Sequence, residues 1–273
     1  MSEQEVRAND GHSVRVGVFG AGGRMGSTVC RAVAADRELE LVGAIDPYHS
    51  GLDLRHATGV DSDVHIDPDP SALLAVGVEV VVDFTTIDAS RANLDWAAEH
   101  GIHAVVGTTG FTADDYKRLR AAFTRSNCVV APNFAIGAVL MMRFAELAAP
   151  WFDTAEIVEL HHDQKVDAPS GTALLTAQRM ADASATWGED PTRKEVVAGA
   201  RGAMGPGGIP VHSVRLRGLV AHQEVLLGTT GQSLTVRHDS YDRSSFMPGV
   251  VLAVKQVGGR PGLTVGLDAL LGL

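Results

Sequence analysis

A short apolar segment followed by a run of glycines constrains this chain more than any other feature of its sequence. Residues 14–19 (VRVGVF) are bounded by a polar stretch and by glycines, as is typical of a buried strand. Gly20, Gly23 and Gly26 follow in GAGGRMG, and residues 25–35 have a helical pattern. This order favours a dinucleotide-binding unit, because a pyrophosphate can approach a glycine turn closely at a helix N-terminus.

An acidic residue after the second predicted strand supports this interpretation. Asp46 follows residues 39–45 (LELVGAI), 20 residues after Gly26, where a carboxylate can accept hydrogen bonds from ribose hydroxyls. Its charge disfavours a 2′-phosphate and so favours NAD, whereas Arg24 in the glycine turn is placed to reach that phosphate and permit NADP. We therefore expect use of NADH and/or NADPH. The alternative is a turn without a ligand, with Asp46 forming a bend before Pro47.

Apolar strands alternate with helices through the first half of the chain. Further strands are expected at residues 78–84, 103–106 and 128–131, and further helices at 90–100 and 112–124. Such an alternation predicts a parallel sheet covered by helices on both faces. Residues 46–70 are rich in Asp, Pro, Gly and His, and we expect a long loop there with little regular structure.

The pattern changes after Asn133. Helices are expected at residues 135–150, 169–183 and 246–256, and strands at 155–161, 211–216, 222–228 and 233–238. Consecutive strands with short turns indicate an antiparallel or mixed sheet. We therefore expect an α/β, Rossmann-like domain with a parallel sheet at residues 1–134 and 244–273, and an α+β domain with a mixed sheet at residues 135–243. The glycine-rich loop at 199–210 should be mobile or contact another subunit.

Composition excludes several classes of protein. The formal net charge is −10 and no run of Lys or Arg occurs, so nucleic-acid binding is not expected. Cys30 and Cys128 form neither a disulfide framework nor a zinc spacing, and we interpret both as buried thiols of a reducing compartment. The polar first 13 residues and the lack of 18 consecutive apolar residues argue against secretion and membrane spanning, which predicts a cytoplasmic location.

Residues 159–172 (ELHHDQKVDAPSGT) are the densest chemical cluster of the sequence. The segment leaves a strand at His161 and enters a helix near Pro169, where Ser170 suits a cap and backbone N–H groups are free for a carboxylate. Lys165 adds a positive charge, and His161 and His162 add titratable donors. Together they suit a doubly anionic substrate. Taken singly, each has an ordinary alternative: a surface histidine, a solvated lysine, a simple cap. No metal-ligand spacing is present.

Five motifs occur in an order that resembles one enzyme family. They are VGVFGAGGRMG, VVDFTT, VVGTTGF, APNFAIGAVL and ELHHDQKVDAPSGTA. Together they resemble the 4-hydroxy-tetrahydrodipicolinate reductase (dihydrodipicolinate reductase) family, and most of all its actinobacterial branch. The resemblance implies a cytoplasmic oxidoreductase of lysine and diaminopimelate biosynthesis, which uses NAD(P)H to reduce a small cyclic dicarboxylate. It also implies that the mixed-sheet domain binds substrate and builds a homotetramer.

The resemblance also assigns residues. His161 matches the family's proton donor/acceptor and Lys165 its proton-donating lysine, while His162, Gly171 and Thr172 match substrate-binding positions. The matching cofactor positions are Gly20, Ala21, Gly22, Gly23, Arg24, Met25, Asp46, Gly107, Thr108, Thr109, Ala131, Pro132, Asn133 and Phe134. One departure is Pro47, which stands where the family often has a basic residue for the 2′-phosphate.

Two other functions share part of this pattern. Another two-domain dehydrogenase, of the aspartate or homoserine type, would have the same N-terminal half but should lack the His-His-x-x-Lys and Ser-Gly-Thr segments. A redox sensor that kept the fold would tolerate loss of His161 or Lys165, yet both residues are present.

Overall fold

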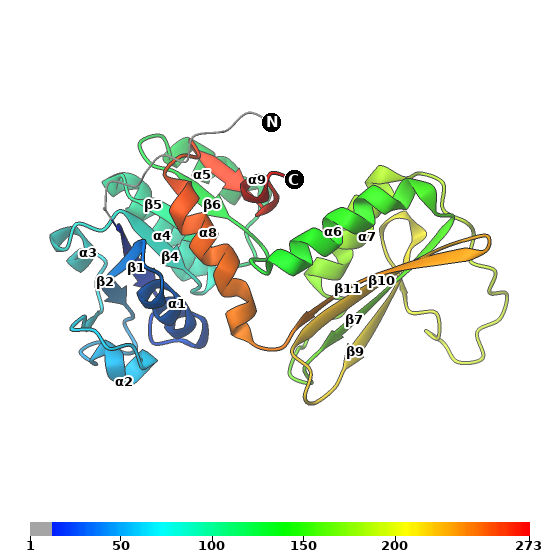
Figure 1. Ribbon diagram of the computed structural model, residues 1–273, viewed down its shortest axis with the longest axis horizontal. Helices are drawn as coiled ribbons and strands as arrows, with labels where there is room; N and C mark the ends of the chain where they lie inside the picture. The colour runs from blue at the N-terminus through cyan, green and yellow to red at the C-terminus, as the bar shows by residue number, and fades with distance from the viewer. Residues whose placement is uncertain (1–12) are drawn as a thin grey trace. The chain divides into compact units, whose positions relative to one another are not determined.

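The computed structural model describes residues 13–273, which form two compact units (Figure 1). One unit contains the described residues up to Pro132 together with Val250–Leu270, and the other contains Asn133–Gly249 with Leu271–Leu273. Each unit has its own sheet, parallel in the first and mixed in the second. The predicted fold class, a Rossmann-like parallel-sheet domain plus an α+β mixed-sheet domain, is confirmed.

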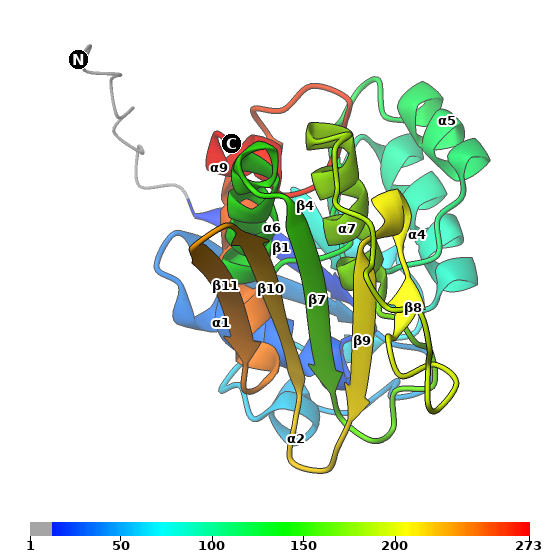
Figure 2. The same ribbon diagram turned by 90° about the vertical axis from the view of Figure 1, so that its right-hand side faces the viewer.

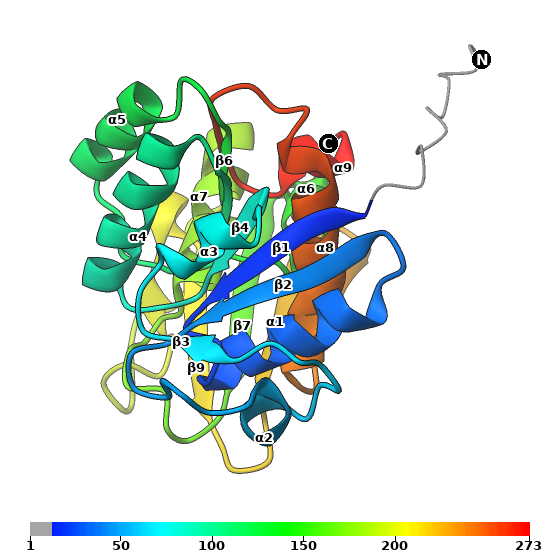
Figure 3. The same cartoon turned by 90° about the vertical axis from the view of Figure 1, so that its left-hand side faces the viewer.

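The seven strands of the first unit are parallel. They are β1 (Val14–Phe19), β2 (Leu39–Ile45), β3 (Ile66–Asp67), β4 (Val80–Asp83), β5 (His103–Val106), β6 (Cys128–Val130) and β12 (Leu263–Val265). Their order is β12-β6-β5-β4-β1-β2-β3, and Figure 3 shows β1, β2 and β3 side by side. The chain therefore reverses direction across the sheet between β1 and β4. At such a switch point the loops diverge and leave room for a ligand.

Helices cover this sheet because its strands are apolar on both sides. They are α1 (Arg24–Ala35), α3 (Ala72–Ala75), α4 (Ile87–His100), α5 (Ala113–Ala122), α8 (Met247–Val257) and α9 (Asp268–Leu271). One core cluster joins Phe19 and Val81 of the sheet to Leu94 of α4 and Leu119 of α5. Short, irregular or late elements (α3, β12 and α9) were not predicted, since each is at most four residues long.

The prediction of little regular structure in residues 46–70 was wrong in part, because α2 (Leu54–Thr58) and β3 lie within this segment (Figure 3). The Asp53 carboxylate accepts the Arg55 N–H at 2.7 Å and caps α2, and Gly59 ends the helix in the left-handed region at φ 77°. Leu54 is fully buried and anchors the turn. A five-residue helix is too short to show helical periodicity in a sequence.

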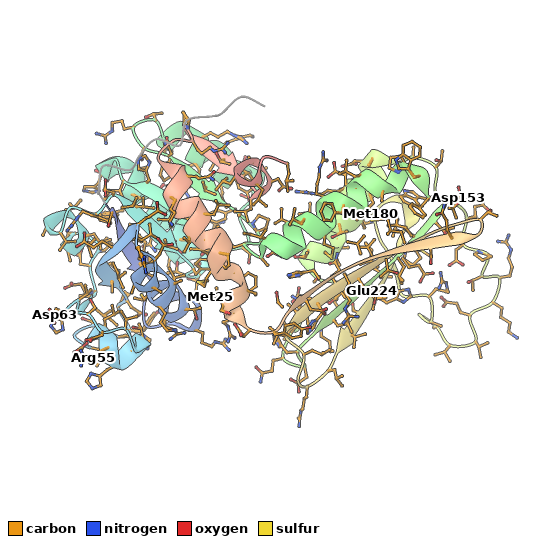
Figure 4. All side chains as sticks on the ribbon, viewed as in Figure 1. Met25, Arg55, Asp63, Asp153, Met180 and Glu224 are labelled. Carbon is orange, nitrogen blue, oxygen red and sulfur yellow. The ribbon has the colours of Figure 1, made fainter. Side chains whose placement is uncertain are left out.

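The second unit has a mixed sheet of five strands, shown in Figure 2. Their order is β11 (Gln232–Ser240), β10 (Ala221–Thr229), β7 (Thr154–His161), β9 (Pro210–Arg215) and β8 (Ala203–Met204), with only β7 and β9 parallel. The helices α6 (Ile136–Ala148) and α7 (Gly171–Ala183) contact each other and pack on the strands. Residues of β7 therefore alternate, and Ala155, Ile157 and Glu159 are buried. Met180 of α7 is also buried, whereas Glu224 of β10 is not (Figure 4 labels both).

The predicted helix at 169–183 and the predicted loop at 199–210 both differ in detail from the structure. The helix predicted from Pro169 begins at Gly171, with Ser170 as its N-cap, and Pro169 precedes it in a cis peptide bond after Ala168. The loop at 199–210 contains β8 and a short 3-10 turn at Pro206–Gly208. Two further 3-10 turns lie at Ala149–Trp151 and Arg243–Phe246.

Candidate active site

The glycine turn after β1 lies in direct contact with the start of α1. Gly20 has φ +68°, in the left-handed region where side chains are strained. A Cβ added at Gly26 would lie 2.0 Å from the Gly20 carbonyl oxygen, so only glycine allows α1 to begin this close to β1. The first N–H groups of α1 have no acceptor in their own helix and can receive an anion; Met25, in this first turn, is labelled in Figure 4.

Asp46 connects this turn to the end of β2. Its carboxylate accepts the Gly22 N–H and the Tyr48 N–H, each at 3.0 Å, and the residue is 4% exposed. His49 Nδ1 lies 3.0 Å from the same carboxylate, and the His49 ring occupies the space that a Cβ on Gly22 would need. A carboxylate has about four acceptor positions, so Asp46 retains capacity for a ribose hydroxyl.

A buried carboxylate holds the loops after β4 and β5 together. Asp83 is fully buried and accepts the Thr85 N–H at 2.8 Å, the Asn93 side-chain amide at 2.8 Å and the Thr108 hydroxyl at 3.1 Å. The same Thr108 hydroxyl lies 3.1 Å from the Thr85 carbonyl oxygen. A Cβ at Gly107 would lie 2.0 Å from the Phe84 ring, so any other residue there would require that ring to move. No role was predicted for Asp83, although an acid that ends an apolar strand is a usable signal.

Four residues directly after β6 were predicted to bind the cofactor, and they are divided equally between the two units. Ala131 donates its N–H to the Val106 carbonyl at 3.0 Å and, with Pro132, belongs to the first unit. Asn133 and Phe134 belong to the second unit. There the Asn133 side-chain oxygen Oδ1 accepts the Ala135 N–H at 2.9 Å just before α6, and its side-chain amide nitrogen lies 3.4 Å from the Thr172 hydroxyl. A residue assigned to the cofactor thus lies beside one assigned to the substrate.

The end of β7 presents His161 against a buried acid. Residues 159 and 161 lie on the same face of the strand, and Glu159 Oε2 accepts a hydrogen bond from His161 Nδ1. Glu159 is fully buried and also forms two 2.9 Å hydrogen bonds with the Arg215 guanidinium. Burial would raise the pKa of Glu159, but the hydrogen bonds from His161, Arg215 and Ser213 outweigh it and lower that pKa to about 2. Glu159 is therefore ionised at neutral pH beside His161.

The N-terminus of α7 starts next to this acid. The Ser170 N–H donates to Glu159 Oε1 at 3.2 Å, and the Ser170 hydroxyl accepts the Ala173 N–H at 3.2 Å. The N–H groups of Gly171 and Thr172 then have no acceptor within their own helix. No atom lies within 4 Å of the position of a Cβ on Gly171, so open space adjoins these donors. The arrangement suits a carboxylate.

Lys165 and His162 lie in the loop between β7 and α7. Lys165 Nζ is 2.8 Å from both carboxylate oxygens of Asp167. This hydrogen bond lowers the pKa of Asp167, so Lys165 faces an anion. His162 is exposed and its Nδ1 accepts the Gln164 N–H at 3.2 Å. The loop itself is held by Arg215, whose Nη2 donates to the Asp167 carbonyl at 2.6 Å.

The structure therefore brings together His161, Lys165, Gly171 and Thr172 in one unit, through residues that sequence reasoning did not assign. Glu159 was predicted only as part of the cluster at residues 159–172, and Arg215 carried no local signal because it lies 56 residues further along the chain. The described residues contain no group of three or more His, Cys, Asp or Glu side chains that could hold a metal ion. Among the same residues no helix is both long enough and apolar enough to span a bilayer.

Both halves of the chain match known protein-family descriptions. The family description "Dihydrodipicolinate reductase, N-terminus" matches residues 14–134, and "Dihydrodipicolinate reductase, C-terminus" matches residues 137–271. The chain belongs to the dihydrodipicolinate reductase family. The resemblance inferred from five sequence motifs is confirmed, and the chain is an oxidoreductase of this family. The family uses NAD(P)H, and the glycine turn and α1 N-terminus of the first unit fit such a cofactor.

Individual relatives cover nearly the whole chain. A 4-hydroxy-tetrahydrodipicolinate reductase from Cutibacterium acnes (strain DSM 16379 / KPA171202) is 54% identical over 266 residues, which cover 95% of this chain and 99% of the relative. One from Nocardia farcinica (strain IFM 10152) is 52% identical over 268 residues, or 96% and 100% of the two chains. Both are actinobacterial, as predicted.

A solved structure supports the same family. It is the dipicolinate-bound dihydrodipicolinate reductase from Paenisporosarcina sp. TG-14, which is 41% identical to this chain with a TM-score of 0.83. The match covers 94% of this chain and 99% of that one. The similarity therefore extends over both units of the fold.

Proposed function

We propose that this chain catalyses the NAD(P)H-dependent reduction of 4-hydroxy-tetrahydrodipicolinate to tetrahydrodipicolinate, with loss of water, in lysine and diaminopimelate biosynthesis. One observation carries the proposal: His161 against buried Glu159, Lys165 and the N-terminus of α7 all lie around the end of β7. The names of the relatives, and the dipicolinate bound by the solved relative, support a small cyclic dicarboxylate as substrate.

The proposed chemistry divides between cofactor and protein. Reduced nicotinamide, when bound, supplies the hydride. Lys165 supplies the proton that the reduced substrate then requires, and its ammonium group offsets the charge of a substrate carboxylate. His161 acts as proton donor/acceptor through Nε2, because its Nδ1 is engaged with Glu159. The products of the proposed reaction are tetrahydrodipicolinate, NAD(P)⁺ and water.

Substrate carboxylates are proposed to bind at the start of α7. The N–H groups of Gly171 and Thr172 and the open space beside Gly171 accommodate one carboxylate. His162 is exposed in the adjoining loop and can donate to the same ligand. These three residues are our substrate-binding set, and the substrate-binding domain is residues 135–243.

Cofactor binding is proposed for residues 1–134 and 244–273. Glycine geometry and the free N–H groups of α1 support a pyrophosphate site at Gly20–Met25, and the buried carboxylate of Asp46 supports a ribose site. Gly107–Thr109 and Ala131–Phe134 complete the proposed set, near the nicotinamide. We propose use of both NADH and NADPH, with Arg24 as the only basic residue of the glycine turn.

A homotetramer is also proposed, built by residues 135–243. Support comes from the mixed sheet: α6 and α7 pack on one side of it, while Val158, Leu160 and Val214 alternate with the buried residues and lie on the other side. Light scattering coupled to gel filtration should give four times the chain mass of 28.7 kDa. The chain mass alone would contradict the tetramer.

We propose the cytoplasm as the location. Cys30 and Cys128 are both free and fully buried, as is usual for proteins of a reducing compartment.

An assay of nicotinamide absorbance tests the function. The substrate is generated from aspartate semialdehyde and pyruvate by the preceding synthase, and NADH absorbance should fall only when the chain is added. Lys165→Met should lower kcat by about 10²- to 10⁴-fold while the NADH Kd is kept. Lys117→Met, at an 81% exposed lysine of α5, is the control. No absorbance loss with the unaltered chain would contradict the proposed function.

A further inference from the structure

Glu159 accepts four hydrogen bonds, and its partners come from three separate segments. Its two oxygens receive Arg215 Nη1 and Nη2 from β9, His161 Nδ1 from β7 and the Ser170 N–H that precedes α7. Strand register explains the convergence. In the parallel pair of β7 and β9, Glu159 is opposite Ser213 and His161 is opposite Arg215.

An isolated charge in this position would be strongly unfavourable, because a fully buried carboxylate loses its hydration. The bidentate ion pair with Arg215 compensates this loss of hydration. Bidentate geometry is what makes guanidinium–carboxylate pairs strong. Apolar residues of similar volume often stabilise a protein as well as a buried ion pair does. Stability alone therefore does not explain why an ion pair stands here.

Contacts of the pair point to positioning instead. Glu159 holds the His161 ring through Nδ1, and it holds the start of α7 through the Ser170 N–H. Arg215 also donates to the Asp167 carbonyl, and Asp167 binds Lys165. One buried ion pair thus contacts every segment that carries a proposed catalytic or carboxylate-binding group of this unit.

We infer that Glu159 and Arg215 are positioning residues for the reductase reaction: Glu159 keeps the proton of neutral His161 on Nδ1, so that Nε2 faces the substrate, and Arg215 keeps Glu159 ionised in place. The inference rests on the proposed function, because it assumes that His161 exchanges a proton with the substrate. It goes further by assigning the tautomer of the histidine and the residues that set it.

Glu159→Gln tests the inference with little change of shape. The new amide nitrogen would replace the oxygen that accepts from His161, and an amide N–H donates rather than accepts. His161 would then accept at Nδ1 and carry its proton on Nε2. An orienting carboxylate replaced by its amide in this way costs up to about 10⁴-fold in kcat in catalytic triads, and we expect a loss of at least about 10-fold here.

The chain offers a matched control three residues upstream on the same strand. Glu156 lies on the opposite face of β7, where it also pairs with an arginine, Arg201, and with His212 Nε2 at 2.8 Å. Glu156→Gln removes the same charge from a more exposed cluster of the same composition without contacting His161. It should leave kcat within about 2-fold of the unaltered chain, provided that gel filtration shows the same assembly.

Two measurements separate positioning from a purely structural role. Imidazole ¹⁵N shifts, assigned with His161→Asn, should show neutral His161 protonated at Nδ1 in the unaltered chain and at Nε2 in Glu159→Gln. Dipicolinate affinity should stay within about 3-fold in Glu159→Gln, so that the loss falls on kcat.

Charged groups lie near His161 on both the sheet and the adjoining loops. Glu159 and Arg215 are on the sheet, Lys165 and Asp167 are in the loop, and Asp163 pairs with Arg217 beside them; β10 places neutral Ala221 and Gln223 opposite residues 161 and 159. An Nε2–H tautomer in the unaltered chain would overturn the inference even if Glu159→Gln does not fold. An active chain whose kcat and tautomer are unchanged in Glu159→Gln would overturn it too, whereas an inactive unaltered chain would instead contradict the proposed function.

Discussion

Lys165 and Asp167 form an ion pair in which Nζ lies 2.8 Å from both carboxylate oxygens. The proposed proton donor is thus held by an acid of its own loop, and a substrate carboxylate must compete with that acid. Asp167 is largely exposed, so the pair is screened by water and is readily exchanged.

Asp167→Asn should therefore tighten dipicolinate binding. We expect the Kd to fall by about 2- to 5-fold, because an exposed ion pair contributes up to about 1 kcal/mol. Isothermal titration calorimetry measures the change. Asp163→Asn is the control, since Asp163 belongs to the same loop but pairs with Arg217 at 2.8 Å. Weaker binding in Asp167→Asn would mean that Asp167 orients Lys165 rather than competing for it.

Substitution by alanine should affect protein stability differently at Gly171 and at Gly26. Gly171→Ala adds a methyl group where no atom lies within 4 Å, so the melting temperature should stay the same while dipicolinate binding is lost to the filled space. Calorimetry of the same samples gives both values, and Gly258→Ala, whose nearest neighbour is 3.9 Å away, serves as control. Unchanged dipicolinate affinity in Gly171→Ala would remove this helix end from the substrate site.

Gly26→Ala should instead destabilise the first unit. Its Cβ would lie 2.0 Å from the Gly20 carbonyl oxygen, and relieving such a contact requires a shift of backbone rather than of a flexible side chain. We expect a loss of about 1–3 kcal/mol in the free energy of urea unfolding, together with weaker NADH binding. Full stability with full NADH affinity would show that α1 can move away from the turn freely.

Asp46 should decide between the two cofactors. Asp46→Asn removes the charge that repels a 2′-phosphate, so the NADPH Kd should fall and the NADH Kd should rise by about 10-fold, as a hydrogen bond to a charged group is lost. Fluorescence titration of both cofactors measures the ratio. Arg24→Gln is the complementary variant and should weaken NADPH alone. Equal shifts for both cofactors in Asp46→Asn would indicate a general disturbance of the turn that Asp46 holds through Gly22.

Acid should destabilise the second unit through Glu159. Its carboxyl has an ordinary pKa of 4.5 when unfolded and about 2 when folded, so the unfolded chain binds the proton first as the pH falls. The stabilisation is therefore complete above pH 4.5 and is lost progressively toward pH 2. Urea unfolding at several pH values from 6 to 3 should show a shallower slope for Glu159→Gln than for the unaltered chain. Parallel slopes would contradict the low pKa.

Local patterns were sufficient for much of the fold. The apolar run of residues 14–19 became β1 because a strand buried on both faces needs no polar alternation, and the glycines after it became the turn before α1. Thr112 and Asp115 produced a complete capping box at α5 for the same local reason. Elements of two to five residues, such as α2 and β3, were missed because they are too short to show a period.

The sequence by itself determined the family, the two kinds of sheet and the segment that carries His161 and Lys165, since these depend on neighbouring residues and on motif order. Only the tertiary structure decided which charge faces which. Glu159 meets Arg215 because β7 and β9 run parallel in one register, and Asp83 meets Thr108 because β4 and β5 end at the same edge. Pairing across strands depends on direction and register, which no local window of sequence contains.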